Sequence, residues 1–316
     1  MDVTLEDIRR AAERIRPIAH RTPVLTSRTF DGLAGVTAFF KCENFQRGGA
    51  FKIRGAANFV YSIPPFERER GVVAYSSGNH AQAVAIAAFS VGIPATLIMP
   101  LDAPRSKAEA TRGYGATIVT YDRLKDDREA IGRRIAAESG ATLVPPYDHP
   151  WTIAGQGTAA LELLAEIPDL DSIVVCLGGG GLASGCAIAA KTLRPGIRVF
   201  GVEPADGNDF WLSRQRGERV TIPPPATIAD GLRAPTPGEL TWPIVQKYLD
   251  DLVTVTDDEI RDTMRLLLLR MKILVEPSGA VSAAAALYRK LPRDLGRTGI
   301  LISGGNVDSD VLAQVL

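Results

Sequence analysis

Short apolar runs alternate with helical segments along most of the chain, and this alternation restricts the fold more than any other feature. From residue 71 to residue 144, the pattern predicts strands at 71–75, 95–99, 117–121 and 142–144, and helices at 79–91, 107–112 and 126–139. Strands that alternate with helices pair in parallel through right-handed crossovers. The block from about residue 70 to residue 147 is therefore predicted to be a small α/β domain.

The same pattern continues on both sides of this block. Predicted strands lie at 36–40, 172–177, 197–202 and 299–302, and predicted helices at 2–15, 53–61, 152–167, 182–193, 256–271 and 277–291. Pro145, Pro146 and Pro150 interrupt the pattern and indicate a domain boundary. The sequence thus predicts an α/β protein with more than one domain.

Composition excludes several kinds of partner. Lysine plus arginine and aspartate plus glutamate number 36 each, so no global charge favours nucleic acid or a membrane surface. No apolar run reaches the ~20 residues that span a bilayer, and residues 1–6 lack a signal-peptide core, which predicts a cytoplasmic protein. Cys42, Cys176 and Cys186 match no zinc or disulfide spacing, and Cys42 and Cys176, which lie in apolar runs, are predicted to be buried as small hydrophobic residues.

Lys52 stands where the loop after the 36–40 strand enters the 53–61 helix, between Phe51 and Ile53. Partial burial and the positive end of a helix both disfavour an ammonium, so the pKa of Lys52 is predicted to be lowered. A lysine that deprotonates easily can form a Schiff base or act as a base. A solvated loop lysine is the alternative, and this stretch alone does not exclude it. Lys41 is interpreted as a solvated loop lysine of this kind.

Gly178, Gly179, Gly180 and Gly181 lie between the 172–177 strand and the 182–193 helix. Bare backbone amides at a helix N-terminus form a site for an anion such as phosphate. Gly178, Gly180 and Ala183 also fit a dinucleotide-binding spacing, with Glu203 where a ribose-binding acid would lie. The glycine run alone does not separate a phosphate site from an NAD site.

Two further stretches lie at predicted turns. Ser76, Ser77, Gly78, Asn79 and His80 follow a strand and open a helix, so they could bind a carboxylate or only cap the helix. We interpret His80 as a packed residue rather than an acid–base catalyst. Ser303, Gly304 and Gly305 end the last strand, a position that also suits a simple turn.

The chain resembles the fold-type II family of pyridoxal-phosphate enzymes, and within it the serine/threonine dehydratases and serine racemase. The resemblance is carried by four motifs in this order: the Lys52 loop, Ser76–His80, Gly178–Gly181 and Ser303–Asn306. The resemblance implies a two-domain, tryptophan synthase β-like fold with open, mostly parallel twisted sheets flanked by helices. It implies a discontinuous large domain, 1–65 plus 148–316, a small domain, 66–147, and a homodimer. An NAD-binding fold would leave Lys52 and Ser303 without a role, and its glycine run would be expected nearer the start of a domain.

The resemblance also implies roles for individual residues. Lys52 would carry pyridoxal 5'-phosphate and act as base, with Ser77 facing it as the second proton carrier that racemisation needs. Phe51 would lie against the cofactor ring, Asn79 at the ring hydroxyl and Ser303 at the ring nitrogen. The phosphate would be bound by Gly178, Gly179, Gly180 and Gly181. The substrate carboxylate would be held by Ser76, Ser77, Gly78, Asn79 and His80.

An acidic loop offers a metal site by the same resemblance. Glu203, the backbone carbonyl of Gly207 and Asp209 would bind a divalent cation, and all-oxygen ligation suits magnesium, calcium or manganese. A solvated acidic loop is the alternative.

The predicted activity is that of an ammonia-lyase. It would convert L-threonine or L-serine to a 2-oxo acid and ammonia, by α-proton abstraction and loss of the β-hydroxyl. The alternatives are a serine racemase, alone or bifunctional, a hydroxyaspartate dehydratase and, from other classes, an NAD-binding oxidoreductase or a non-catalytic ligand-binding relative. The partner in each case is a small molecule, and no nucleic acid or membrane is expected.

Overall fold

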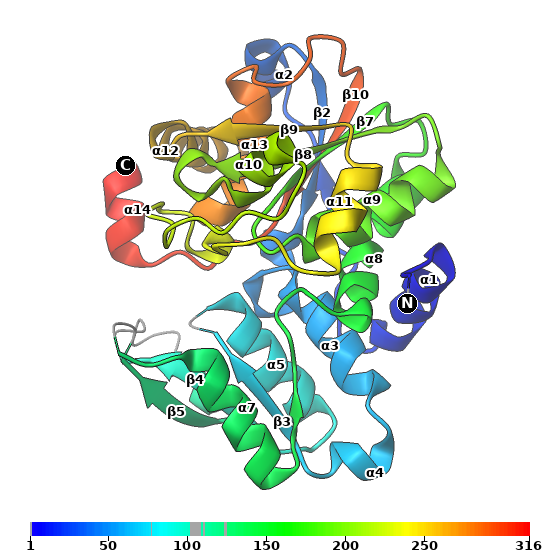
Figure 1. Cartoon of the computed structure of the whole chain (residues 1–316). Helices are drawn as coiled ribbons and strands as arrows, with labels where there is room; N and C mark the ends of the chain where they lie inside the picture. The colour runs from blue at the N-terminus through cyan, green and yellow to red at the C-terminus, as the bar shows by residue number, and fades with distance from the viewer. Residues whose placement is uncertain (1, 77, 102–108, 110, 123–124) are drawn as a thin grey trace.

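The computed structural model describes residues 2–76, 78–101, 109, 111–122 and 125–316. Within these residues the strands form two sheets, which lie in separate lobes (Figure 1). The larger sheet runs in the order β1 (Val24–Leu25), β2 (Thr37–Cys42), β10 (Arg297–Ile302), β7 (Ser172–Cys176), β8 (Arg198–Pro204), β9 (Asp251–Val255). The smaller runs β5 (Thr117–Tyr121), β4 (Ala95–Pro100), β3 (Val72–Tyr75), β6 (Thr142–Leu143). Only the β1–β2 pair is antiparallel among these strands, so the predicted α/β fold with mostly parallel sheets is confirmed.

Helices flank both sheets. The large lobe carries α1 (Leu5–Ile15), α2 (Arg28–Ala34), α8 (Pro150–Glu166), α9 (Gly181–Leu193), α10 (Asp209–Arg216), α11 (Thr241–Tyr248), α12 (Asp257–Leu266), α13 (Pro277–Leu287) and α14 (Ser309–Val315). The small lobe carries α4 (Pro65–Arg68), α5 (Asn79–Ser90) and α7 (Arg128–Ser139). Short turns are η1 (Glu43–Phe45), η2 (Arg47–Gly49), η3 (Ala205–Gly207), η4 (Asp230–Leu232) and the π-helical η5 (Leu267–Met271).

Helix α3 (Lys52–Ser62) connects the two lobes. It packs against α5 of the small lobe and against α8 of the large lobe. Its buried residues Ile53, Ala57 and Val60 belong to the apolar core that also covers the small sheet. We keep the division into 1–65 plus 148–316 and 66–147 as a proposal, with α3 as the element that both lobes share.

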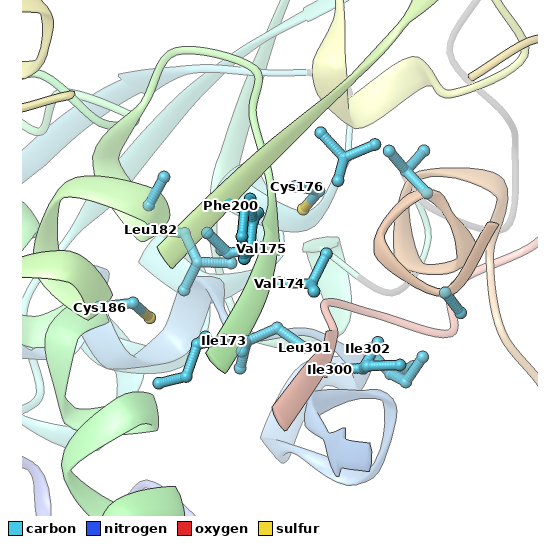
Figure 2. Packing of buried hydrophobic residues seen from close by; sticks show 14 of the residues in the cluster. Ile173, Val174, Val175, Cys176, Leu182, Cys186, Phe200, Ile300, Leu301 and Ile302 are labelled. Carbon is cyan, nitrogen blue, oxygen red and sulfur yellow. The ribbon is translucent and has the colours of Figure 1, made fainter. Parts of the chain in front are cut away.

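The core of the large lobe lies around β7, β8 and β10. Figure 2 shows apolar side chains of β7 packed beside those of the neighbouring strands and of α9. The labelled set is Ile173, Val174, Val175, Cys176, Leu182, Cys186, Phe200, Ile300, Leu301 and Ile302. Cys42, Cys176 and Cys186 are all buried and free, which confirms the predicted burial of Cys42 and Cys176.

Buried ion pairs hold α3 in place. The Arg54 guanidinium, fully buried, donates two hydrogen bonds to Glu43 (2.7 and 2.8 Å) and two to Glu162 (2.8 Å each). Lys41 Nζ lies 2.6 Å from Glu162 Oε2. Lys41 is therefore a buried strand residue, and its interpretation as a solvated loop lysine was wrong. Since every charge in this cluster has a partner, Arg54 fixes α3 against η1 and α8, and Lys41 joins β2 to α8.

Several elements differ from the sequence-based expectation. The helix predicted for 256–271 is α-helical only to Leu266, after which η5 widens the turn, and α13 ends at Leu287 rather than at residue 291. Strand β9 and helix α2 were not predicted, because each is short and carries no clear periodicity. Of the helix predicted at 107–112, residues 109, 111 and 112 are helical, and the other three lie outside the described residues. None of the helices in the described part of the chain is long and apolar enough to cross a bilayer.

Candidate active site

Lys52 is the first residue of α3, and its side chain points to the crossing between the lobes. It is partly buried, and its Nζ donates to the carbonyl oxygen of Pro146 at 2.8 Å. Burial lowers the pKa of Lys52 to about 8, while Cys176 and Glu276 oppose part of the shift. The predicted direction of the shift is therefore confirmed. An amine with such a pKa is neutral in a useful fraction of molecules near neutral pH.

The loop that carries Lys52 is joined to the loop that carries Ser303. The Phe51 amide donates to the Ser303 carbonyl at 3.0 Å, and Ala50 forms an isolated bridge with Gly304. The Ser303 hydroxyl is buried and donates to the Ser278 carbonyl at 3.2 Å. Ser303 therefore lies next to the backbone of the lysine loop, and its hydroxyl retains lone pairs that can accept a further hydrogen bond.

Phe51 lies beside the lysine that follows it. Its ring centroid is 5.2 Å from Lys52 Nζ, and the side chain packs against the core of the large lobe. The role of Phe51 at a cofactor ring stays a prediction, because core packing explains the same position.

The glycine run forms a tight cradle at the start of α9. Gly180 has a φ of +87°, and no side chain caps the helix within the described residues. A Cβ at Gly179 would lie 2.2 Å from the Tyr147 ring, and one at Gly180 would lie 2.7 Å from Phe210. Only glycine fits these positions, and the free amides at the helix N-terminus suit a phosphate group. The cradle therefore fits the phosphate of pyridoxal phosphate.

The Ser76–His80 segment joins β3 to α5 in the small lobe. The Gly78 amide donates to Ser76 Oγ at 3.2 Å, and Asn79 Nδ2 donates to Glu276 Oε1 at 2.7 Å across the lobes. A Cβ at Gly78 would meet no heavy atom within 4 Å among the described residues, so this side of the segment is open. Ser77 lies outside the described residues.

His80 is a packed residue. It is 3% exposed, and burial together with the nearby Lys52 lowers its pKa to about 3. Its Nε2 is 3.0 Å from the Val144 carbonyl oxygen, which only accepts, so Nε2 carries the proton of a neutral ring. The geometry agrees with its interpretation as a packed residue.

The acidic loop lies behind the glycine cradle. Glu203 ends β8 and accepts from the amides of Phe210 (3.0 Å) and Trp211 (2.7 Å) at the start of α10. Among the described residues no N–H group donates to either buried carboxylate oxygen of Asp209, whose carboxyl lies beside that of Glu203, and Gly207 is buried in η3. Burial, and then the neighbouring Asp209, raise the pKa of Glu203, and burial raises that of Asp209 to about 7.

This arrangement bears on two predictions. Unpartnered buried carboxylate oxygens are a suitable donor set for a hard cation. No cluster of three or more His, Cys, Asp or Glu side chains occurs in the described part of the chain, so backbone carbonyls such as that of Gly207, or water, would have to complete the coordination. Because Glu203 is fully buried and bonded to the start of α10, it is not accessible to a ribose and does not fit the ribose-binding acid of a dinucleotide fold.

Two residues of the site carry no motif in the sequence. Tyr147 covers Gly179 from the segment that crosses back to the large lobe, and burial raises its pKa to about 12. Glu276 contacts Asn79 from the start of α13. The sequence signals were indirect: Tyr147 follows two prolines at the predicted boundary, and Glu276 precedes Pro277 at a helix start.

The structure thus brings Lys52, Ser303, Asn79 and the glycine cradle to one crossing between the lobes. They lie where β7 and β10 of the large sheet and β3 of the small sheet end. In parallel α/β sheets, ligands bind beyond the carboxyl ends of the strands. Their individual roles in binding and catalysis stay predictions.

Comparison with known proteins identifies what this site resembles. The family model described as pyridoxal-phosphate dependent enzyme matches residues 15–304. A serine racemase of Schizosaccharomyces pombe is 50% identical over 313 residues, covering 99% of this chain and 97% of the relative. An L-threo-3-hydroxyaspartate ammonia-lyase of Saccharomyces cerevisiae is also 50% identical, covering 99% and 96%. The solved structure of maize serine racemase is 45% identical, with a TM-score of 0.96 and coverage of 99% and 97%.

Proposed function

The chain belongs to the pyridoxal-phosphate dependent enzyme family, and from that premise we propose that it removes the α-proton of a small β-hydroxy amino acid. The substrates we propose are serine and threo-3-hydroxyaspartate, because the relatives carry serine racemase and hydroxyaspartate ammonia-lyase names. These relatives favour the two alternatives of the sequence analysis over dehydration of threonine as the main activity.

One observation carries the proposal. Lys52 is a partly buried amine whose pKa is lowered to about 8, and it stands at the lobe crossing beside Ser303 and the glycine cradle. A lysine of this kind is suited both to bind a carbonyl compound covalently and to take up a proton. The buried ion pairs of Arg54, two residues further along α3, hold this lysine in position.

The remaining site residues would hold the cofactor and its substrate. The amides of Gly178–Gly181 would bind the phosphate, Ser303 would face the ring nitrogen, Phe51 would lie against the ring and Asn79 would donate to the ring hydroxyl. When bound, pyridoxal phosphate supplies the electron sink that acidifies the α-carbon. Ser303 offers a hydroxyl rather than a carboxylate, so it does not keep a proton on the ring nitrogen.

The substrate carboxylate would be received by the Ser76–His80 segment, through the free amides at the start of α5. Lys52 would take the α-proton from one face as general base. Loss of the β-hydroxyl would then lead to a 2-oxo acid and ammonia. Return of a proton from Ser77 on the opposite face would instead give the D-amino acid, so Ser77 is the residue we propose for racemisation.

We also propose a divalent cation, magnesium, calcium or manganese, bound by Glu203, the Gly207 carbonyl and Asp209. Its support is the pair of buried oxygens of Asp209, to which no N–H group of the described residues donates. A cation there would tie the end of β8 to α10, and Phe210 of α10 lies close to Gly180 in the phosphate cradle. The cation would therefore support the cradle rather than contact the substrate.

A cytoplasmic homodimer completes the proposal. Two-fold dimers are the commonest oligomers of soluble proteins. Phe45 and Leu274 are 47% and 42% exposed, and Asn44, beside Phe45, donates to the carbonyl of Leu274. These neighbouring apolar side chains support an interface on this face of the large lobe.

The test is a substrate panel in heavy water with magnesium. L-Serine, L-threo-3-hydroxyaspartate and L-threonine would be followed by proton NMR for 2-oxo acid and α-deuteration, and by chiral analysis of what remains. We expect turnover of serine or hydroxyaspartate, none with Lys52→Ala and normal turnover with the exposed Lys247→Ala. Pyruvate with little D-serine would assign an ammonia-lyase, and α-deuterated D-serine a racemase. Threonine as the only substrate would contradict the proposal.

A further inference from the structure

A buried carboxylate with no assigned role, Glu276, faces the small lobe. It is 2% exposed and directly precedes α13 in the large lobe. Its Oε1 accepts from Nδ2 of Asn79, the first residue of α5 in the small lobe, at 2.7 Å. A hydrogen bond between a buried carboxylate and an amide is a strong one, because the acceptor is charged.

The other end of the Asn79 amide is also occupied. Asn79 Oδ1 accepts from Asn306 Nδ2 at 2.9 Å, and Asn306 Nδ2 donates to the Gly48 carbonyl at 2.7 Å. Since the carboxylate and the Gly48 carbonyl only accept, both amides can point only one way. Asn79 therefore presents its oxygen to Asn306 and its NH₂ to Glu276, and one N–H of that NH₂ is left to donate elsewhere.

Two glycines make room for this arrangement. A Cβ at Gly304 would lie 2.2 Å from Glu276 Oε1, and a Cβ at Gly49 would lie 2.2 Å from Asn306 Oδ1. The backbones of the same segments are bonded together: Glu276 donates to the Gly304 carbonyl at 3.1 Å, and Gly305 to the Gly49 carbonyl at 2.8 Å. The loops of Lys52 and Ser303 thus form the rigid frame from which Glu276 and Asn306 reach Asn79.

We propose that Glu276 and Asn306 are positioning residues that fix the Asn79 amide as a donor toward the cofactor's ring hydroxyl and fasten α5 of the small lobe to the large lobe. The donor role rests on the proposed function of Asn79, whereas the fastening of the lobes does not. Donation to the ring oxygen favours its deprotonated form, so Glu276 sets the state of the cofactor through Asn79 and not by contact.

Glu276→Gln is the central variant because glutamine keeps the shape of the side chain. A neutral amide makes a weaker hydrogen bond and can present N–H to Asn79, so Asn79 would populate both orientations. We expect cofactor affinity to fall about fivefold to tenfold. The ratio of visible to near-ultraviolet absorbance of the bound cofactor should fall as well. Asn306→Ala should act in the same direction, and Glu138→Gln, on the exposed face of α7, should change neither.

A double-mutant cycle with Asn79→Ala separates positioning from a general structural effect. If Glu276 acts through Asn79, Glu276→Gln has no further effect on affinity or absorbance in the Asn79→Ala background. Full additivity of the two substitutions would overturn the proposal.

Hydrogen exchange on the protein without cofactor tests the contact between the lobes separately. We expect faster exchange of the hydrogen-bonded amides of α5, from Ala83 onward, in Glu276→Gln and in Asn306→Ala, and unchanged exchange in both variants would overturn the fastening role. A wild-type protein that binds no pyridoxal phosphate would overturn the proposed function and the donor role with it. The exchange result would still decide the fastening.

Discussion

At the scale of single residues, the environment of Lys52 explains why its pKa is lowered, which is the property that the proposed reaction needs. Burial lowers its pKa, and a carbonyl oxygen, that of Pro146, accepts from its Nζ without neutralising its charge. A buried carboxylate in direct contact would instead have stabilised the ammonium, as Glu162 does for Lys41. The two lysines therefore differ in chemistry because they differ in partner.

The pKa of Lys52 predicts how cofactor binding depends on pH. Because it is lowered to about 8, the neutral amine becomes the major form as the pH rises through that value. Covalent binding of pyridoxal phosphate to the cofactor-free protein should therefore accelerate from pH 6 to pH 8 and level off above about pH 9. Stopped-flow absorbance measures this rate. A profile that is flat, or that rises only above pH 10, would contradict the environment described for Lys52.

The sequence predicted this residue but not its surroundings. The place of Lys52 between a strand and a helix predicted a lowered pKa, because burial and helix position are local properties, but its role followed only from the resemblance of four motifs to a known family. Glu276 and Tyr147 were not recognised as part of the site. Glu276 contacts Asn79, which is 197 residues away in the sequence. Tyr147 contacts Gly179 from the segment that crosses back to the large lobe. Such contacts depend on how the lobes are packed.

At the scale of elements, glycines set how closely the helices around the site approach. Gly157 of α8 faces Gly185 of α9, and a Cβ at Gly157 would lie 2.7 Å from the Gly185 carbonyl oxygen. On the other face of α8, a Cβ at Gly155 would lie 2.4 Å from the carbonyl oxygen of Arg54 in α3. The helix that carries Lys52 and the helix that begins at the glycine cradle are therefore both packed at close range against α8.

Gly157→Ala should destabilise the protein by about 3 kcal/mol, because an added methyl group meets backbone that cannot move aside. Gly32→Ala is the matched control: Gly32 lies within α2 with no described atom within 4 Å of a Cβ, so alanine should stabilise by about 0.5–1 kcal/mol. Urea unfolding measures both free energies. Equal stability of Gly157→Ala and the wild type would contradict the close packing of α8 and α9.

The elements themselves were largely predictable from periodicity, as β3, α5 and β4 show. The exceptions have local causes. Leu267–Leu268–Leu269 continues the apolar pattern of α12, so nothing in the sequence indicates that the chain leaves the α-helical spacing there to form η5. Asp251–Val255 is too short and too mixed to be recognised, and only its pairing with β8 makes it a strand.

At the scale of the whole molecule, the order of the strands was not accessible from the sequence. Strand β10 pairs with β2 on one side and with β7 on the other, which brings Ser303 next to Phe51 although some 250 residues separate them. The resemblance to a known family implied a discontinuous large domain, whereas alternation alone predicted only a small α/β block and its boundary. The site is formed by this long-range pairing, so no local pattern contains it.

A divalent cation should stabilise the folded molecule through the acidic loop. At roughly a hundredfold excess over its Kd, magnesium, calcium or manganese should raise Tm by about 5 °C, because it binds the native state only. Asp209→Asn should remove this response, whereas Asp206→Asn, exposed in the same loop, should retain it. Differential scanning fluorimetry with and without chelator is the measurement. A response that survives Asp209→Asn would place the cation elsewhere.

The central claim is that this chain carries pyridoxal phosphate on Lys52. Borohydride reduction of the cofactor-loaded protein, followed by peptide mass spectrometry, locates the attachment directly. We predict a phosphopyridoxyl group on the peptide that contains Lys52, none in Lys52→Ala and an unchanged result in Lys247→Ala. Attachment to another lysine in the active protein, or turnover without any attachment, would contradict the account.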